Sequence, residues 1–300
     1  MSEYHVPVLL NESVDGLNIN PDGIYVDATF GGGGHSSEIL SRLSAKGTLI
    51  AIDRDSDAHN NKIDDSRLKL VFGNYRYLRN YLDYYGIEKV DGILADLGVS
   101  SHQFDVAERG FSFRMGGKLD MRMSEQSSRT AADVLNGASE DGLFRIFRNY
   151  CDVQNVGRLV KSIVARREGE PFGEIDDFVN FLEQFAPKNR EIKYYAQIFQ
   201  ALRIEVNDEI ASLGDFLTAA PQVLARGGRL SVISYHSMED RLVKNLIRTG
   251  TVDGEDERDV FGRANLSLKP INKQVVVPSD EEVERNPRAK SAKLRISEKM

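Results

Sequence analysis

The sequence is poor in the features that mark disulfide-rich, metal-binding and membrane-spanning proteins. Its 300 residues include a single cysteine, Cys151, which excludes an internal disulfide and a thiolate metal cluster. The five histidines show no i,i+4 pairing, so we expect no structural metal. No apolar run approaches the roughly 18 residues of a membrane span, and the run at 6–10 is too short for a signal peptide. We therefore expect a cytoplasmic protein with no membrane partner.

The charge of the chain gives an ambiguous signal about its partners. A net charge of −7 argues, taken alone, against binding to nucleic acid. The average conceals three groups of cations, in the segments 109–122, 142–170 and 285–300. Each group fits an ordinary solvated surface as well as a nucleic-acid-binding one, so other evidence has to decide between the two.

Apolar runs and helical patterns alternate through the first hundred residues. The candidate strands are residues 24–28, 48–52, 68–72 and 90–95. Strands that alternate with helices predict a parallel, doubly wound α/β sheet. Strand character returns at 229–234, after Gly227 and Gly228. Two further candidates, 274–277 and 292–296, predict an antiparallel pair at the sheet edge.

The alternation breaks in the middle of the chain. Residues 102–123 are rich in glycine and arginine and resemble a loop, whereas 130–184 has helical periodicity almost throughout. A further apolar helical pattern extends from Ile192 to Leu213. We therefore expect a discontinuous α/β domain, residues 1–108 and 205–300, with an inserted all-helical domain at 109–204.

Four consecutive glycines, 31–34, separate the first predicted strand from a helix. Glycine allows the backbone to approach a ligand closely and tolerates the positive φ of a tight turn. The second predicted strand ends in Asp53, about 20 residues further on, where an acidic residue binds ribose hydroxyls in doubly wound folds. A flexible turn without a ligand is the simpler alternative, but it does not explain the placement of Asp53.

The spacing of the loop restricts the choice of nucleotide-like cofactor. No Gly-Lys-Ser/Thr follows the glycines, which argues against a P-loop. A dinucleotide fits less well, because Ser36 stands where G-x-G-x-x-G has its last glycine. The common option that remains is S-adenosylmethionine, which has a ribose but no phosphate. Its binding requires close approach of the backbone and an acidic residue for the ribose hydroxyls, and the sequence offers both.

Polar or aromatic residues follow each of the five predicted parallel strands, where doubly wound sheets bind their ligands. These residues are Asp27, Asp53, Tyr75, Asp96 and His236. Structural alternatives exist: Asp27 and Asp96 could cap turns, Tyr75 could pack in the core, and His236 could be a satisfied structural histidine. The Ser100–His102 segment lacks a G-x-S-x-G elbow, which argues against a hydrolase.

Several longer motifs, in order along nearly the whole chain, resemble one known family. They are HVPVLL at 5–10, DATFGGGGHS at 27–36, AIDRD at 51–55, DGILADLGVSSHQFD at 91–105, ERGFSFR at 108–114, LDMRM at 119–123, FQALRIEVN at 199–207, SYHSMEDR at 234–241 and NPRAKSAKLR at 286–295. The chain resembles the RsmH (MraW) family of small-subunit ribosomal RNA cytosine-N4 methyltransferases. DLGVSS, ERGFSFR and SYHSMEDR are far more specific than the glycine loop.

The resemblance implies a class I S-adenosylmethionine-dependent methyltransferase fold with an inserted helical domain. It also implies the residues that contact the cofactor, namely Gly33, Gly34, His35, Asp53, Tyr75, Asp96 and Gln103. Tyr75 stands where the family often has phenylalanine, which keeps an aromatic wall. The implied substrate is a cytidine in the decoding region of small-subunit (16S) rRNA, within an assembled subunit. The Ser/Asp-Pro-Pro-aromatic motif of DNA cytosine-N4 methyltransferases is absent, so its catalytic roles cannot be transferred.

The expected reaction suggests further site residues. The cytosine N4 lone pair is delocalised into the ring, so catalysis needs in-line alignment and acceptors that draw density toward N4. We expect Asp96, Ser100 and Ser101 to supply acceptors, with His236 nearby. The base must leave its stack to reach the site. We expect substrate contacts from one cluster of the inserted domain, namely Arg109, Phe111, Phe113 and Arg114, although core packing would also explain its aromatic rings.

Other functions remain open at this level. A methyltransferase for DNA or a small molecule is disfavoured by the missing Pro-Pro motif and by the large basic insertion. An NAD-dependent reductase is disfavoured by the glycine spacing. A ribosome assembly factor that binds the cofactor without turnover stays possible, because binding and catalysis share residues. The sequence indicates no oligomeric state.

Overall fold

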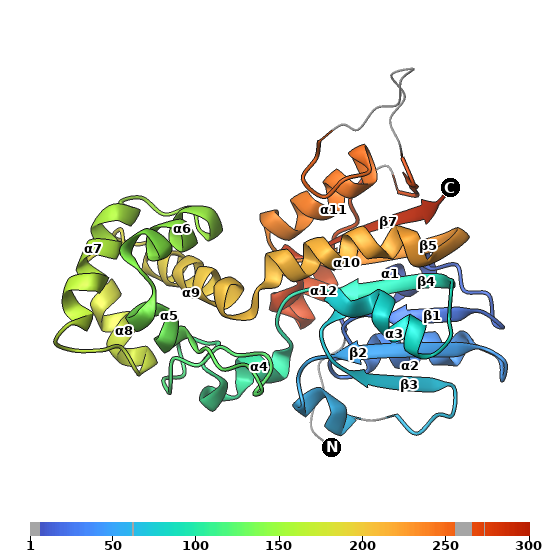
Figure 1. Ribbon diagram of the computed structural model, residues 1–300, viewed down its shortest axis with the longest axis horizontal. Helices are drawn as coiled ribbons and strands as arrows, with labels where there is room; N and C mark the ends of the chain where they lie inside the picture. Colours follow the sequence, from blue (N-terminus) through green and yellow to red (C-terminus); the bar gives the residue numbers. More distant parts are fainter. Residues whose placement is uncertain (1–6, 62, 256–265, 273) are drawn as a thin grey trace. The chain divides into compact units, whose positions relative to one another are not determined.

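The computed structural model describes residues 7–61, 63–255, 266–272 and 274–300, apart from the side chain of Ser101. The chain forms two compact units, one made of residues 1–98 and 210–300 and the other of 99–209 (Figure 1). The chain thus passes between the two units at residues 98/99 and 209/210, whereas the sequence analysis placed the domain boundaries at 108/109 and 204/205. None of the described helices is long and apolar enough to cross a membrane.

The first unit is built on a seven-stranded sheet in the order β3-β2-β1-β4-β5-β7-β6. The strands are β1 (Ile24–Asp27), β2 (Thr48–Asp53), β3 (Leu68–Phe72), β4 (Val90–Asp96), β5 (Leu224–Ser234), β6 (Leu268–Pro270) and β7 (Lys293–Lys299). β1 to β5 are parallel, and β7 is antiparallel to both of its neighbours. The expected α/β fold of the class I S-adenosylmethionine-dependent methyltransferases is confirmed.

Helices cover both faces of this sheet, which explains why its central strands are apolar at nearly every position. Successive strand residues point to opposite faces, so Tyr25 and Leu49 pack with one set of helices while Val26 and Ile50 pack with the other. The first set is α1 (Leu10–Gly16) and α2 (Gly34–Arg42). The second set is α3 (Leu78–Tyr84), α10 (Glu209–Val223) and α11 (Ser237–Thr249).

The edge of the sheet differs from the sequence-based expectation. The strand predicted at 292–296 is present as β7, but its outer partner is β6 at 268–270. The predicted strand at 274–277 contributes only the bridge between Val276 and Leu294. After Pro270 the Ile271 N–H still donates to the Ile296 carbonyl at 2.9 Å, but the Ile296 N–H is accepted by the Asn272 side chain at 3.0 Å. A side chain thus replaces a backbone partner. The short helices α12 (Asp280–Arg285) and η4 (Pro287–Ser291) precede β7.

The second unit is helical, apart from a long ordered loop. Its helices are α4 (Ser101–Asp105), η3 (Ala107–Arg109), α5 (Ala131–Gly137), α6 (Glu140–Tyr150), α7 (Val156–Arg167), α8 (Ile175–Leu182) and α9 (Glu191–Asn207). They enclose one core that includes Phe147, Phe178 and Leu202, each essentially inaccessible to solvent. The apolar pattern that continues past residue 207 in the sequence is broken at Asp208, whose φ of 50° ends α9.

Candidate active site

The glycine loop lies between the end of β1 and the start of α2. Gly31 and Gly33 have φ values of 51° and 78°, in the left-handed region that favours glycine. A Cβ on Gly34 would lie 2.1 Å from the Pro7 side chain, so this position needs glycine for packing. The Ser37 N–H and hydroxyl both donate to the Gly33 carbonyl, at 2.8 and 2.7 Å. The loop therefore has a defined shape and no side-chain bulk.

Asp27 holds this loop from beneath. Its carboxylate is completely buried and accepts hydrogen bonds from the Ser36 hydroxyl at 2.6 Å and the Thr29 N–H at 3.1 Å. Burial raises the pKa of Asp27 to about 6, although both hydrogen bonds favour the charged form. Asp27 is thus a structural support of the site, as a turn-capping role predicted.

Asp53 ends β2 and connects it to the same loop. One carboxylate oxygen accepts the Gly31 N–H and the other accepts the Asp55 N–H, each at 2.8 Å. Burial raises the pKa of Asp53 above its usual value. A carboxylate has about four lone-pair sites, so these two bonds orient the group and leave capacity for ribose hydroxyls.

Tyr75 follows β3, at the same end of the parallel strands. The Asn74 side chain accepts the Arg76 N–H at 3.0 Å and so caps the short helix η2 (Tyr75–Tyr77). The Tyr75 ring meets Phe216 edge to face, with centroids 5.3 Å apart, and stays partly exposed. Tyr75 therefore packs against the core on one side and keeps part of its surface exposed after β3.

Asp96, at the end of β4, is hydrogen-bonded to residues that follow β1 and β5. Its N–H donates to the Thr29 hydroxyl at 2.7 Å, and its Oδ1 accepts the Tyr235 hydroxyl at 2.8 Å. Its side chain keeps 23% of its exposure. Burial raises its pKa to about 6, against the lowering effects of His35 and the Tyr235 hydrogen bond; the charges of Asp27 and Glu239 raise it further.

His35 faces Asp96 from the first turn of α2. Its Nε2 lies 3.2 Å from the Val8 carbonyl, so Nε2 carries the hydrogen and Nδ1 carries the lone pair of the neutral ring. Burial lowers the pKa of His35, which keeps the ring neutral. Nδ1 lies 3.9 Å from Asp96 Oδ2. Two acceptors therefore face each other, and a donor from a bound ligand could satisfy both.

His236 follows β5 and caps α11. Its Nδ1 accepts the Glu239 N–H at 3.4 Å, while Glu239 Oε2 accepts the His236 N–H at 3.2 Å. Because Nδ1 accepts in this cap, the hydrogen of the uncharged ring is on Nε2, a buried atom that lies 3.1 Å from Glu239 Oε1 but has no partner with hydrogen-bond geometry among the described residues. The capping box gives His236 a structural task at the site edge.

The predicted residues Ser100 and Gln103 form a second capping box, at the start of α4. The Ser100 hydroxyl accepts the Gln103 N–H at 3.2 Å, and Gln103 Oε1 accepts the Ser100 N–H at 3.1 Å. Gln103 is buried, with 4% exposure. Ser101 begins the helix, but its side chain lies outside the described part of the chain. Both serines and Gln103 belong to the unit of residues 99–209.

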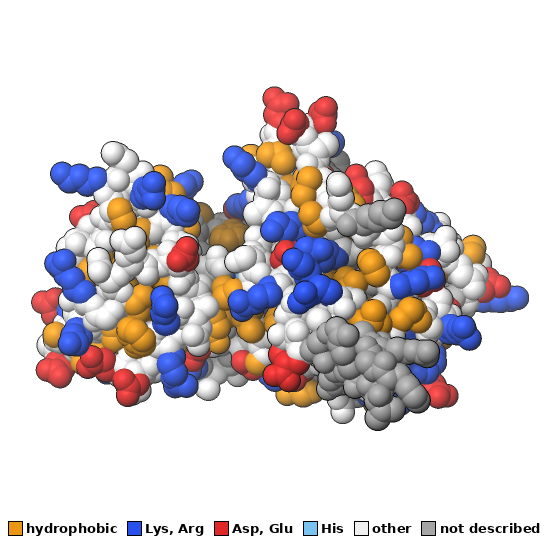
Figure 2. All heavy atoms as spheres, turned by 90° about the horizontal axis from the view of Figure 1, so that it is seen from above, with side chains coloured by type: hydrophobic (Ala, Val, Ile, Leu, Met, Phe, Trp, Pro, Cys, Tyr) orange, Lys and Arg blue, Asp and Glu red, His pale blue; other side chains and the backbone are white. Residues whose placement is uncertain are grey.

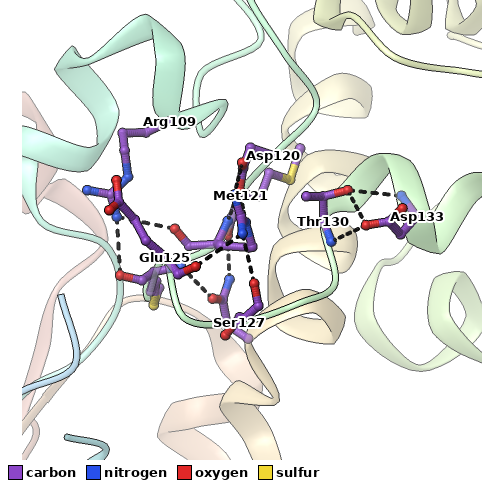
Figure 3. Close-up of polar contacts among 10 residues, drawn as sticks. Arg109, Asp120, Met121, Glu125, Ser127, Thr130 and Asp133 are labelled. Carbon is purple, nitrogen blue, oxygen red and sulfur yellow. Dashed lines mark hydrogen bonds and ion pairs between the residues drawn. The ribbon is translucent and has the colours of Figure 1, made fainter. Parts of the chain in front are cut away.

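The predicted substrate residues mostly stabilise the second unit. Arg109 is 8% exposed, and its Nη2 donates to the carbonyls of Arg122 and Met123 at 3.2 Å (Figure 3). Phe111 is 5% exposed and lies in the core, so no ring face is accessible for stacking on a base. Phe113 packs edge to face against Tyr195 and Phe199.

Arg114 differs from the other three predicted substrate residues. Its side chain is exposed, and its guanidinium lies 5.6 Å from the centre of the Phe113 ring. Phe111 and Phe113 therefore pack in the core of the second unit, and a direct RNA contact stays a prediction for Arg114.

The sequence interpretation did not select Tyr235 or Thr29. The Tyr235 hydroxyl donates to the Asp96 carboxylate, and the Thr29 hydroxyl accepts the Asp96 backbone N–H. A signal for Tyr235 existed, because it lies between Ser234 and His236 at the end of a predicted strand. For Thr29, no pattern distinguishes a hydroxyl that supports β4 from an ordinary loop threonine.

The whole chain matches proteins of one family. A model of the MraW methylase family matches residues 2–300. A "Ribosomal RNA small subunit methyltransferase H" of Phocaeicola vulgatus is 55% identical over 296 residues, which cover 99% of this chain and 97% of that protein. A protein of the same name from Christiangramia forsetii is 51% identical over 300 residues, with coverage of 100% and 99%. Among solved structures, an rRNA methylase from Streptococcus thermophilus aligns with a TM-score of 0.40 and 14% identity, covering 99% of each chain.

Proposed function

The chain belongs to the MraW methylase family, and on this basis we propose that it methylates the N4 amine of a cytidine in the decoding region of small-subunit (16S) ribosomal RNA. The methyl donor is S-adenosylmethionine. The observation that carries the proposal is the group around Asp96, where Tyr235 and His35 surround a partly exposed carboxyl beside the glycine loop.

The residues at the carboxyl ends of the parallel strands fit S-adenosylmethionine. The bare loop at Gly33 and Gly34 allows close backbone approach, and Asp53 presents an oriented carboxylate to ribose hydroxyls. Tyr75 offers an aromatic face to the adenine, and His35 and Asp96 offer acceptors to the ammonium group. Gln103, from the start of α4, completes the proposed set. When bound, the cofactor supplies an electrophilic methyl group on a sulfonium.

The chemistry requires an acceptor for the N4 hydrogens. N4 is a weak nucleophile, and it carries an extra proton once the new N–C bond forms. Asp96, with a pKa of about 6, is ionised at neutral pH and can accept this hydrogen bond and then the proton. Tyr235 keeps its hydrogen, because burial and the charge of Asp96 raise its pKa well above 10. It therefore orients Asp96 and does not compete as a base.

Ser100, Ser101 and His236 have supporting roles in this proposal. Ser100 uses one hydroxyl lone pair for the α4 cap, and its hydrogen and second lone pair can serve a base. Ser101 is adjacent to it in the chain. His236 Nδ1 accepts the Glu239 N–H, and Glu239 in turn accepts the Tyr235 N–H, so we assign His236 the role of a positioning residue.

The helical unit, residues 109–204 in the sequence-based division, is proposed to recognise the RNA in the assembled subunit. The target base must be extruded from its stack to reach Asp96, which a looped or single-stranded RNA allows at least cost. Arg114 is the exposed member of the predicted group and can contact a backbone phosphate.

Methyl transfer to isolated small subunits tests the proposal. Subunits from a strain without this modification are incubated with labelled S-adenosylmethionine, and the rRNA is digested and analysed by mass spectrometry. We expect an N4-methylcytidine peak with the wild type and none with Asp96→Ala. Asp83→Ala, at an exposed aspartate of α3, is the matched control. A methyl group on another nucleoside would overturn the cytosine-N4 assignment. Cofactor binding without transfer to any subunit preparation would favour an assembly factor.

A further inference from the structure

Cations from two separate motifs of the sequence meet on one face of the unit 1–98/210–300. Helix α11 contributes Arg241 and Lys244, and β7 contributes Lys293 and Arg295. Arg295 donates to Asp240 through two nitrogens, at 2.7 and 3.2 Å, and Lys293 Nζ lies 3.7 Å from the same carboxylate. The segments are more than forty residues apart in sequence, so the fold creates this cluster.

The side-chain periodicities of α11 and β7 explain why these cations lie on one face. Along β7 the side chains alternate, so Leu294 and Ile296 are buried against Val8 and Leu9 while Lys293 and Arg295 point to the opposite face. Helix α11 packs on that face through its own buried residues, which are Glu239, Val243, Leu246 and Thr249. The outer stripe of α11 consists of Arg241, Lys244 and Arg248, at i, i+3 and i+7, and all three are exposed.

Positive charge exceeds negative charge in this cluster. Asp240 is the carboxylate at its centre, and the charges of Arg295, Lys293 and Lys244 lower its pKa against the opposing effect of burial. One negative charge therefore faces three positive ones, with Arg241 next to it on the helix. Neither Arg241 nor Lys244 forms an ion pair within the described part of the chain. Figure 2 shows a face of the molecule on which Lys and Arg side chains gather.

The cluster begins next to the proposed reaction site. Helix α11 starts directly after its cap, His236, and the preceding residue, Tyr235, holds Asp96. Arg241 follows His236 by five residues, which is about 8 Å along a helix axis. An RNA strand whose target base lies at Asp96 would pass its neighbouring phosphates within reach of these side chains.

We propose that Arg241, Lys244 and Lys293 bind backbone phosphates of the RNA beside the target nucleotide. The inference rests on the proposed function and assigns part of its substrate surface. RNA fits better than an acidic protein, because the outer stripe is made of lysine and arginine. Protein interfaces are depleted in lysine and concentrate aromatic side chains at their centre, whereas nucleic-acid interfaces depend on lysine and arginine contacts to phosphates.

A pair of double charge reversals tests this surface. Arg241→Glu/Lys244→Glu changes the proposed surface, and Lys46→Glu/Arg226→Glu is the matched control. The control residues are exposed and lie near the starts of β2 and β5, at the opposite ends of those strands from the site. Cofactor affinity, measured by calorimetry, should equal the wild-type value in both variants, which shows that the unit is folded.

The readouts are the KM for small subunits over a KCl series and the Kd for a fluorescein-labelled single-stranded RNA. In the test variant we expect KM and Kd to rise about tenfold or more, with kcat within about twofold. The slope of log KM against log salt should fall by about 2, one for each lost phosphate contact. The control variant should match the wild type in all of these quantities.

The outcomes separate this inference from the proposed function. Equal KM, Kd and salt slope in the two variants would overturn the phosphate-binding surface, whatever reaction the protein catalyses. Loss of subunit binding with full affinity for the RNA probe would assign the surface to a protein partner and would also overturn it. If the wild type methylates no rRNA, the proposed function fails, and the RNA probe still tests the surface.

Discussion

The Tyr235 hydroxyl donates a hydrogen bond of 2.8 Å to Asp96 Oδ1, from the end of β5 to the end of β4. Burial raises the pKa of Asp96 to about 6, and the Tyr235 hydrogen bond lowers it. The pKa of Tyr235 itself is raised well above 10, so the phenol remains a donor at every relevant pH. Tyr235 thus helps to keep Asp96 ionised near neutral pH.

Replacing Tyr235 with phenylalanine should move the pH dependence of methyl transfer. In the wild type, kcat/KM should rise with pH through about 6, as Asp96 loses its proton. Tyr235→Phe removes a donor that stabilises the carboxylate, so the pKa of Asp96 should rise further and the ascending limb should shift to higher pH by about one unit. The measurement is kcat/KM for small subunits between pH 5 and 9.

Tyr84→Phe provides the control for this shift, because Tyr84 is 83% exposed. Its profile should superimpose on that of the wild type. A Tyr235→Phe profile that is lower at every pH by one constant factor would contradict the electrostatic role and leave Tyr235 a packing residue.

Gly33→Ala should weaken cofactor binding. Gly33 has a φ of 78°, and a Cβ there would lie 3.0 Å from Cζ of Phe30. The left-handed conformation costs a residue with a Cβ about 1–2 kcal/mol, so the loop should relax away from its present shape. We expect the Kd for S-adenosylmethionine, measured by calorimetry, to rise at least about tenfold.

Gly214→Ala is the matched glycine control. Gly214 lies inside α10, and a Cβ there would meet nothing within 4 Å. Alanine in a helix interior is more stable than glycine by about 0.5–1 kcal/mol. The Kd should stay unchanged while the thermal midpoint rises slightly. Equal loss of affinity in both variants would show that the glycine loop has no special role.

The sheet was predictable because its signals are local. Apolar runs that end in Asp53 and Asp96 identify strands and their polar ends without knowledge of the fold. The parallel arrangement then brings these ends to one edge of the sheet. Six of the seven cofactor candidates, all except Gln103, lie at or just after these strand ends.

The remaining features depend on contacts between distant residues. The cap at His236 depends on which nitrogen faces Glu239, and no sequence pattern specifies a tautomer. An aromatic residue between arginines looks the same in sequence whether it stacks on a base or fills a core, and burial places Phe111 in the core. The outer strand β6 was missed because Leu268–Pro270 is too short for a period to be read.

Asn207→Ala should destabilise the long loop of the helical unit. The Asn207 side chain is 5% exposed, accepts the Met123 N–H at 2.7 Å, and donates to the Met121 carbonyl at 2.7 Å. Alanine would leave both buried backbone groups without these partners, at about 1–3 kcal/mol for each group. We expect faster hydrogen exchange across residues 119–131 and a lower unfolding midpoint.

Asn149→Ala, at an exposed asparagine of α6, should change neither quantity. If the loop amides exchange at wild-type rates in Asn207→Ala, the network around Arg109 and Arg122 suffices to hold the loop, and the prediction fails.

Asp27→Asn should reduce the pH dependence of stability. The pKa of Asp27 is about 6 in the folded protein, above its ordinary value of 3.8, so the folded state binds this proton more tightly than the unfolded state. Its contribution to stability is therefore fully present below pH 3.8 and is lost as the pH rises through about 6. The difference of about two pKa units corresponds to about 3 kcal/mol.

Asparagine can still accept the Thr29 N–H and can donate to the Ser36 hydroxyl, so the loop should keep its shape without the titrating group. The free energy of unfolding in urea, compared between pH 4 and pH 7, should therefore fall by about 3 kcal/mol less in Asp27→Asn than in the wild type. Asp83→Asn, at an exposed aspartate, should follow the wild type. Parallel pH dependence in Asp27→Asn and the wild type would mean that the carboxyl beneath the glycine loop stays ionised throughout this range.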